Sequence, residues 1–325
     1  MSGTRRKVTA AASAPGLAVG PAAQSPRKER AAAVSIFSNT LLILLKVVAG
    51  VVTGSIAILT EAAHSAIDLV ASVIAFFSVR KASEPADADH PYGHDKVENV
   101  AAGIEGMLIL VGAGVIIFES IRRLAEGAHV ESLGFGIAVI GFSAVANIAV
   151  SAYLYRQARE TESPALEGDA AHLRTDAFTS MGVLVGLVLV ELTGAEWLDP
   201  AAALVVAGAI VFAGVRILNR TSRVLVDESL PEDEMEALRR TVASHGAPEL
   251  IGFHKLRARR AGSRRYIDLH VQFRDGTSLR RAHEISHELQ RAIAGTLRGA
   301  DVLIHLEPEE AADRDPREPV RPGRP

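Results

Sequence analysis

Cysteine is absent from this chain of 325 residues. Its absence excludes disulfide bonds and thiolate metal ligands, so any bound metal ion must be held by nitrogen and oxygen atoms. An excess of basic residues is also missing, because the formal net charge is −3, and this argues against nucleic acid as a partner. Residues 1–30 contain no apolar stretch that could serve as a signal peptide. We predict that this segment and residues 310–325 are disordered tails.

Apolar residues, in contrast, are abundant, at 48% of the chain with a mean hydropathy of +0.20. Such values are more typical of a membrane protein than of a soluble one. A membrane-spanning helix needs about 20 mostly apolar residues. The sequence predicts a six-helix transmembrane domain over residues 31–221. The six predicted spans lie near residues 34–53, 56–80, 99–121, 134–155, 171–192 and 199–218.

Lysine and arginine are concentrated on one side of these spans. They occur in the N-terminal tail, in the loops after the second and fourth spans, and throughout the chain beyond Arg216. By the positive-inside rule this side is cytoplasmic, which places both termini in the cytoplasm. Arg122 and Arg123, after the third span, depart from this pattern. We therefore expect a multi-pass protein of the cell (inner) membrane, surrounded by lipid.

Residues 222–309 read as a separate α/β domain. A proline followed by acidic residues marks the start of a helix, and two segments of alternating apolar residues predict strands. An amphipathic helix and a last strand follow. We predict a small domain with the order α-β-β-α-β, whose elements begin near residues 231, 251, 264, 278 and 300.

Two of the apolar spans carry a histidine and an aspartate four residues apart, on one face of each helix. These pairs are His64 with Asp68 and His172 with Asp176. A charged side chain at the bilayer centre costs about 2.5–3.5 kcal/mol. Two imidazoles and two carboxylates can together supply the four ligands of a tetrahedral ion, and this set suits zinc better than calcium or magnesium. Manganese, cobalt and ferrous iron also accept these ligands, and hydrogen bonds between helices are the structural alternative.

The sequence around these pairs resembles the cation diffusion facilitator family of metal exporters. The resemblance is carried by GSIAILTEAAHSAIDLVAS, PADADHPYGHDKVENVAA and AAHLRTDAFTSMG, and it covers about residues 30–309, including the C-terminal domain. It implies that the two His/Asp pairs form the transport site and that histidine at position 64 favours zinc. It also implies a homodimer joined through a metallochaperone-like cytoplasmic domain.

A second cluster of potential ligands lies in the loop PADADHPYGHDK. Carboxylates and imidazoles on a turn that contains proline and glycine can bind metal weakly, and a solvated turn is the alternative. The loop residues in question are Asp87, Asp89, His90 and His94. The resemblance implies a secondary metal site made chiefly of Asp87, His90 and His94.

The resemblance also implies roles for three residues near these sites. Glu61, where relatives often carry aspartate, is either a proton or ion relay or a group that hydrogen-bonds to a neighbouring helix. Lys96 corresponds to a residue that pairs with an acidic partner, here Asp227. That salt bridge would lock the membrane domain and the C-terminal domain together at the dimer interface.

Five of the 11 histidines lie between residues 254 and 305. His305 and Glu307 share a face of a strand, and His283 and His287 share a face of a helix. The resemblance implies one or two zinc sites in this domain, with ligands at His254, His270, His283, His305 and Glu307. His287 has less support, and histidines that are simply half-buried are the alternative interpretation.

These features predict a transporter and not an enzyme. Protons compete with metal for imidazole, so we expect zinc export from the cytoplasm in exchange for protons, regulated by zinc binding to the C-terminal domain. Cadmium, ferrous iron, cobalt and manganese are alternative substrates. A membrane metallohydrolase would need an open coordination position, whereas two His/Asp pairs fill four positions. A membrane metal sensor would not need ligands inside the bilayer.

Overall fold

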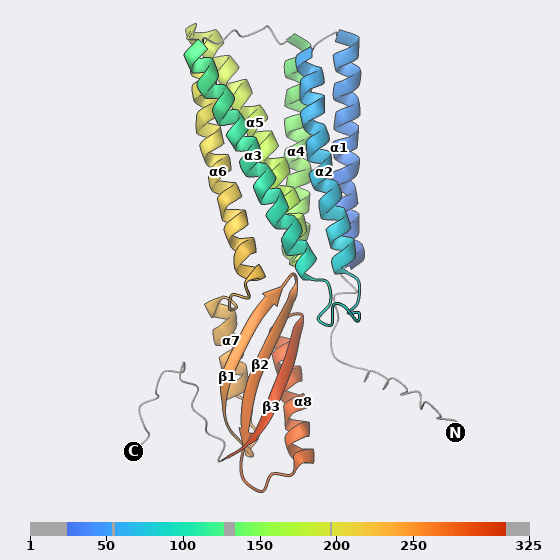
Figure 1. Ribbon diagram of the computed structural model, residues 1–325, viewed down its shortest axis with the longest axis vertical. Coiled ribbons are helices and arrows are strands. Elements are labelled where there is room, and N and C mark those ends of the chain that lie inside the picture. The colour runs from blue at the N-terminus through green and yellow to red at the C-terminus, as the bar shows by residue number, and fades with distance from the viewer. Residues whose placement is uncertain (1–24, 54–55, 127–133, 196, 310–325) are drawn as a thin grey trace, which may run out of the picture.

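The computed structural model describes residues 25–53, 56–126, 134–195 and 197–309. Six long helices form the upper part of the molecule and a small α/β domain the lower part (Figure 1). The helices are α1 (Ser25–Thr53), α2 (Ile56–Ala82), α3 (Lys96–Glu126), α4 (Gly134–Thr161), α5 (Pro164–Thr193) and α6 (Leu198–Leu225). They match the six predicted spans in number and order. The predicted C-terminal tail and residues 1–24 of the N-terminal tail lie outside the described residues.

Every helix extends beyond its predicted span, mostly on the side of the α/β domain. Helix α1 begins at Ser25, inside the predicted tail, and its Lys28 is buried with Nζ 2.7 Å from a carboxylate oxygen of Glu98 on α3. Helix α5 begins at Pro164, with Ser163 as its N-cap. Hydropathy locates only the apolar middle of each helix, whereas caps and ion pairs extend the polar ends.

Close packing of α3 along α6 is possible because glycines lie between them. A Cβ atom on Gly214 of α6 would come within 2.9 Å of Leu110, and one on Gly106 of α3 within 3.3 Å of Ile217. Helix α1 also packs along α2, and α4 along α5. Small residues at such contacts let membrane helices approach closely.

Large apolar side chains cover the outer surface of this bundle. Three helix segments are long and apolar enough to cross a membrane among the described residues, and they are Pro26–Ala49, Lys96–Glu126 and Pro200–Leu225. Well-exposed examples of the apolar side chains are Phe37, Val111, Phe118, Val205 and Phe212. An apolar surface of this extent is unfavourable in water but is the expected surface in lipid.

The C-terminal domain has the predicted order α-β-β-α-β. Strands β1 and β2 pair antiparallel, β2 and β3 pair parallel, and β2 lies in the centre of the sheet. A parallel pair needs a crossover connection, which α8 supplies between β2 and β3. The elements are α7 (Glu232–Ala243), β1 (Leu250–Ala261), β2 (Arg264–Phe273), α8 (Leu279–Thr296) and β3 (Ala300–Pro308).

The two faces of this sheet have different surroundings. Helices α7 and α8 cover one face (Figure 1), where Ile267 and Leu269 of β2 pack with Ile285 and Leu289 of α8. Side chains alternate along a strand, so the intervening residues of β2, such as His270, point to the other face. Among the described residues no helix covers that second face, and we call it the open face of the sheet.

The tip of the β1–β2 hairpin contacts the start of α3. The Gly262 backbone N–H donates to Asn99 Oδ1 at 2.9 Å, and the Tyr266 hydroxyl donates to the Tyr92 carbonyl at 2.6 Å. These bonds attach the C-terminal domain to a membrane helix at the side of the bundle where that helix begins.

Candidate metal centres

The first candidate centre lies inside the helix bundle, between α2 and α5. Asp68 of α2 and His172 and Asp176 of α5 bring one ligand atom each to within 4.8 Å of one another. His172 Nε2 is 3.2 Å from Asp68 Oδ1 and 3.8 Å from Asp176 Oδ2. Asp68 and His172 are each only 6% exposed. The i, i+4 spacing on α5 and the packing of α2 against α5 produce this convergence.

The side chains of His64 and Glu61 lie outside the described part of the structure. His64 is four residues before Asp68 on α2, so the helix carries both residues on one face. Its role as a fourth ligand stays a prediction, as does the relay role of Glu61.

Two carboxylates beside one imidazole form a site that attracts a cation. No lysine or arginine lies within ion-pair distance of Asp68 or His172 among the described residues, and the ring atom His172 Nδ1 has no hydrogen-bond partner. A buried cluster of negative charge is unfavourable unless a cation compensates it. The donor set of nitrogen and carboxylate oxygen is one that zinc and related ions accept.

The second candidate centre is the loop between α2 and α3. Ligand atoms of Asp87, His90 and His94 lie within 4.8 Å of one another. The His90 amide donates to Asp87 Oδ1 at 2.6 Å, and this bond holds the pKa of Asp87 below its ordinary value. The Asp89 amide also donates to Asp87 Oδ1, at 3.0 Å, so Asp87 caps this turn, and the Asp89 side chain is outside the ligand group. His94 is buried at 3% exposure, whereas Asp87 and His90 are exposed.

The third candidate centre lies on the open face of the sheet. His254, His270 and His305 are aligned across the three strands, because His254 pairs with His270 and His270 pairs with His305. Glu307 Oε2 is 2.7 Å from His254 Nε2, and Glu307 Oε1 is 2.6 Å from His270 Nδ1. His254, His270 and Glu307 therefore form a three-ligand group. His305 lies at its edge, with Nε2 3.8 Å from Glu307 and 64% of its side chain exposed.

His283 does not join this group. It is exposed on α8, the helix that covers the opposite face of the sheet, and its Nε2 is 3.2 Å from that of His287. The segment from His283 to His287 reads His-Glu-Ile-Ser-His, a pattern that zinc hydrolases carry on a helix. Among the described residues no third ligand accompanies the pair, so this chain alone does not complete such a site.

The implied contact between Lys96 and Asp227 is present in the structure. Lys96 Nζ lies 2.8 Å from Asp227 Oδ1, as the resemblance implied, and Arg259 also binds Asp227, at 2.9 Å.

Sequence reasoning missed Glu105 and Asp169, which are fully buried between α3 and α5. Glu105 interrupts an apolar run, so the cost argument used for the His/Asp pairs could have identified it.

Models of known protein families match both halves of the chain. A cation efflux transmembrane domain matches residues 32–226, and the cytoplasmic domain of cation efflux proteins matches residues 230–309. The first of these covers more than half of the chain.

Curated relatives extend over nearly the whole chain. An uncharacterized transporter of Synechocystis sp. is 34% identical over 86% of this chain and 90% of its own length. The cation-efflux pump FieF of Yersinia enterocolitica is 30% identical over 90% of this chain and 97% of its own. A solved structure of the putative zinc transporter CzrB in its zinc form is 35% identical, covers 27% of this chain and 99% of its own, and has a TM-score of 0.26. The chain belongs to the cation efflux family, the cation diffusion facilitators, and is a membrane transporter of divalent cations.

Proposed function

We propose that the protein exports zinc from the cytoplasm in exchange for protons, through a site made by His64, Asp68, His172 and Asp176. The observation that carries this proposal is the convergence of three buried ligand atoms from α2 and α5 within 4.8 Å. A fourth position on the same face of α2 is a histidine. The names of curated relatives, cation-efflux pumps, support the direction of transport.

The choice of zinc follows from the ligand types. Zinc takes four nitrogen and oxygen ligands at about 2.0–2.2 Å in tetrahedral geometry. Calcium needs six to eight oxygen atoms and magnesium an octahedral oxygen shell, so two imidazoles disfavour both. Cadmium, ferrous iron, cobalt and manganese accept the same donors and remain candidate substrates of the same site.

Proton exchange follows from the same ligands. Imidazole binds metal only when neutral, so each metal ion that enters displaces protons and each proton that enters weakens metal binding. An acidic exterior therefore promotes release, and a neutral cytoplasm promotes loading. We expect the protein to lie in the cell (inner) membrane with both termini in the cytoplasm. In that orientation α5 begins on the cytoplasmic side, where metal is loaded.

We infer that the cytoplasmic domain regulates transport as part of a homodimer. His254, His270 and Glu307 fit a zinc ion, because their donor atoms lie close together and the Glu307 carboxylate already connects the two imidazoles. Zinc held there would neutralise a negative group and fix β1, β2 and β3 relative to one another. The Lys96–Asp227 contact would couple zinc binding in the cytoplasmic domain to α3, which begins at Lys96.

Zinc flux into proteoliposomes under an imposed pH gradient tests the proposal. We expect gradient-dependent flux for the native protein and a loss of about tenfold or more for Asp176→Ala, which removes a ligand. Asp89→Ala is the matched control, because it removes an exposed carboxylate that is not part of the loop's ligand group. Equal flux for the native protein and Asp176→Ala would contradict transport through this site and favour a metal sensor.

A further inference from the structure

Glu105, in α3, is a buried carboxylate without a partner. None of its surface is exposed, and neither of its carboxylate oxygens has a hydrogen-bond partner among the described residues. Asp169 of α5 is equally buried, and although its Oδ1 accepts from Ser72 at 2.9 Å, its Oδ2 has no partner. Burial of an uncompensated carboxylate is strongly unfavourable. A buried carboxylate of this kind needs a cation or a proton. Among the described residues no basic side chain is bonded to Glu105 or Asp169.

A glycine on α5 lets the Glu105 carboxylate approach the backbone of that helix. A Cβ atom built on Gly168 would lie 2.1 Å from Glu105 Oε2 and 3.2 Å from the Cα of Ala102. The Glu105 carboxylate therefore lies directly on the backbone of α5, where no side chain is present. Asp169 is the next residue along α5. Any larger residue at position 168 would displace the carboxylate.

Polar groups connect this pair with the transport site. Asp169 lies three residues before His172 on α5, and Ser72, which donates to Asp169, lies four residues after Asp68 on α2. Asn39 of α1 donates to Ser72 at 2.8 Å. Asp169 and its partner Ser72 therefore lie about one helical turn from the transport site, toward the cytoplasmic end of the bundle.

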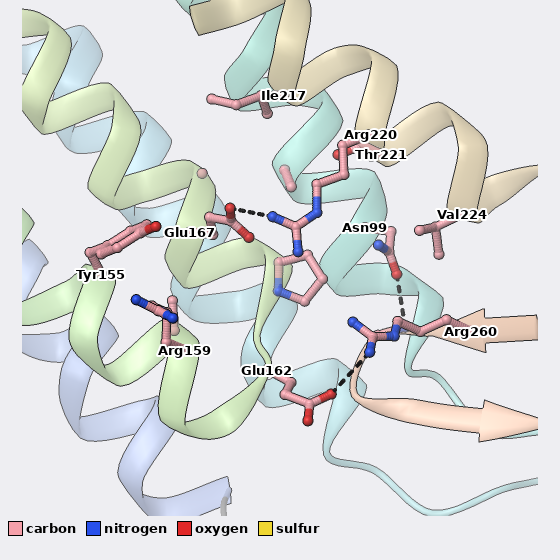
Figure 2. A pocket seen from close by; sticks show the side chains of 15 residues that line it. Asn99, Tyr155, Arg159, Glu162, Glu167, Ile217, Arg220, Thr221, Val224 and Arg260 are labelled. Atoms are coloured by element: carbon pink, nitrogen blue, oxygen red, sulfur yellow. Dashed lines mark hydrogen bonds and ion pairs between the residues drawn. The ribbon is translucent and has the colours of Figure 1, made fainter. Parts of the chain in front are cut away.

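A cavity approaches the same pair from the cytoplasmic side. It has a volume of about 390 Å³ and lies where α3, α4, α5 and α6 meet the β1–β2 hairpin (Figure 2). Gly168, against which the Glu105 carboxylate lies, and Ala102 line it. Ion pairs cross the cavity (Figure 2), one of them between Arg260 and Glu162 at 3.5 Å. The cavity thus reaches Gly168, the residue against which the Glu105 carboxylate lies.

We propose that Glu105 and Asp169 form a second cation-binding site, which the transported divalent cation occupies between the cytoplasmic cavity and the transport site. This inference rests on the proposed function. The site offers carboxylate and hydroxyl oxygens only, and such a set holds zinc less tightly than one that contains imidazole. A cation therefore gains affinity as it moves from Glu105 and Asp169 to His172, which favours loading from the cytoplasm.

The main test measures zinc uptake into proteoliposomes over a range of zinc concentrations. Glu105→Gln keeps the shape of the side chain and removes its charge. We expect its KM for zinc to rise about tenfold, because the cation loses its first intramembrane ligand. Glu126→Gln, at the exposed end of the same helix, is the matched control and should keep the native KM. Equal KM values for Glu105→Gln and the native protein would overturn the proposal.

A second variant tests the geometry without altering either carboxylate. Gly168→Ala places a methyl group where Glu105 Oε2 lies, so it should raise KM as Glu105→Gln does. Gly112→Ala is the control, because a Cβ atom there meets nothing within 4 Å. A native KM for Gly168→Ala, in a protein that folds, would contradict a cation site that depends on the position of this carboxylate.

Binding and stability measurements separate this inference from the proposed function. Equilibrium zinc binding to the purified full-length protein should show one weak site fewer in Glu105→Gln than in the native protein, whether or not zinc is transported. The melting temperature of Glu105→Gln should not fall, because the native carboxylate has no bond to lose. A lower melting temperature with unchanged zinc stoichiometry would mean that Glu105 is structural. If the native protein showed no zinc flux, the export proposal would be rejected. The zinc-binding measurement would still decide whether Glu105 and Asp169 form a cation site.

Discussion

At the scale of single residues, Glu307 supplies the negative charge of the candidate metal site on the open face of the sheet. Burial raises the pKa of its carboxyl group, but hydrogen bonds with His270 and His254 outweigh this effect and lower the pKa below its ordinary value. Glu307 therefore stays ionised as the pH falls from 8 to about 5. Competition between protons and metal in this range must therefore take place on the imidazole ligands.

This assignment predicts how zinc binding to the cytoplasmic domain depends on pH. Zinc affinity should fall as the pH decreases from 8 to 5.5, because protons compete with the metal for the imidazole ligands whereas Glu307 stays ionised. Glu307→Gln should lower the affinity about 10–100-fold at every pH, without changing this slope. Calorimetric titration of the purified protein between pH 5.5 and 8 measures both. A slope that disappears in Glu307→Gln would assign the proton competition to the carboxylate instead.

The ligand groups could be predicted from sequence where helical or strand spacing brings the residues together. Asp176 lies four residues after His172, and both reach the same buried group as the spacing predicts. His283 and His287 likewise share one face of α8, but sequence could not show that α8 covers the face of the sheet opposite to His270. Glu105 has its neighbours on another helix, so only the packing of α3 on α5 shows what it contacts.

At the scale of elements, the hairpin of β1 and β2 connects the two domains through Gly262. This glycine has φ +54, and a Cβ atom on it would lie 2.7 Å from the Asp95 carbonyl oxygen just before α3. Both the left-handed backbone and the close approach require glycine. The Gly262 N–H also donates to Asn99, so the hairpin tip is fixed against α3 by shape and by hydrogen bonding.

We predict that Gly262→Ala separates the hairpin tip from α3. Backbone amides in the tip and in the first turn of α3 should then exchange with deuterium about tenfold faster or more, because the contact that protects them is lost. Gly276→Ala is the matched control: its φ is +86, so alanine is strained there too, but a Cβ atom meets nothing within 4 Å. Equal exchange at the hairpin tip in both variants would show that the contact with α3 does not protect the tip.

The order of elements was predictable, but their pairing was not. Alternating apolar residues and an amphipathic helix predicted α-β-β-α-β from composition and spacing. The same pattern does not specify that β3 pairs parallel with β2 and places His305 beside His270. That register depends on how α8 crosses the sheet, which is decided by packing among residues far apart in the chain.

At the scale of the whole molecule, we propose that a second copy of the chain covers the open face of the sheet. Leu303 pairs with Asp268 and therefore points to the same face as His270 and His305. It is 68% exposed, which is unusual for a leucine in the middle of a strand. A dimer through this face would bury Leu303 and place the zinc ligands of two subunits near each other.

This arrangement predicts that Leu303→Ala weakens dimer formation. Burying a leucine side chain contributes about 1.5–3 kcal/mol, so the dissociation constant of the dimer should rise about tenfold or more. Leu279→Ala is the matched control, because Leu279 is equally apolar and 77% exposed but begins α8 on the other side of the sheet. Sedimentation of the detergent-solubilised protein, with zinc and with a chelator, measures the dimer fraction. Zinc should raise the fraction in the native protein and in Leu279→Ala. If Leu303→Ala dimerised as well as Leu279→Ala, the open face would not be the dimer interface.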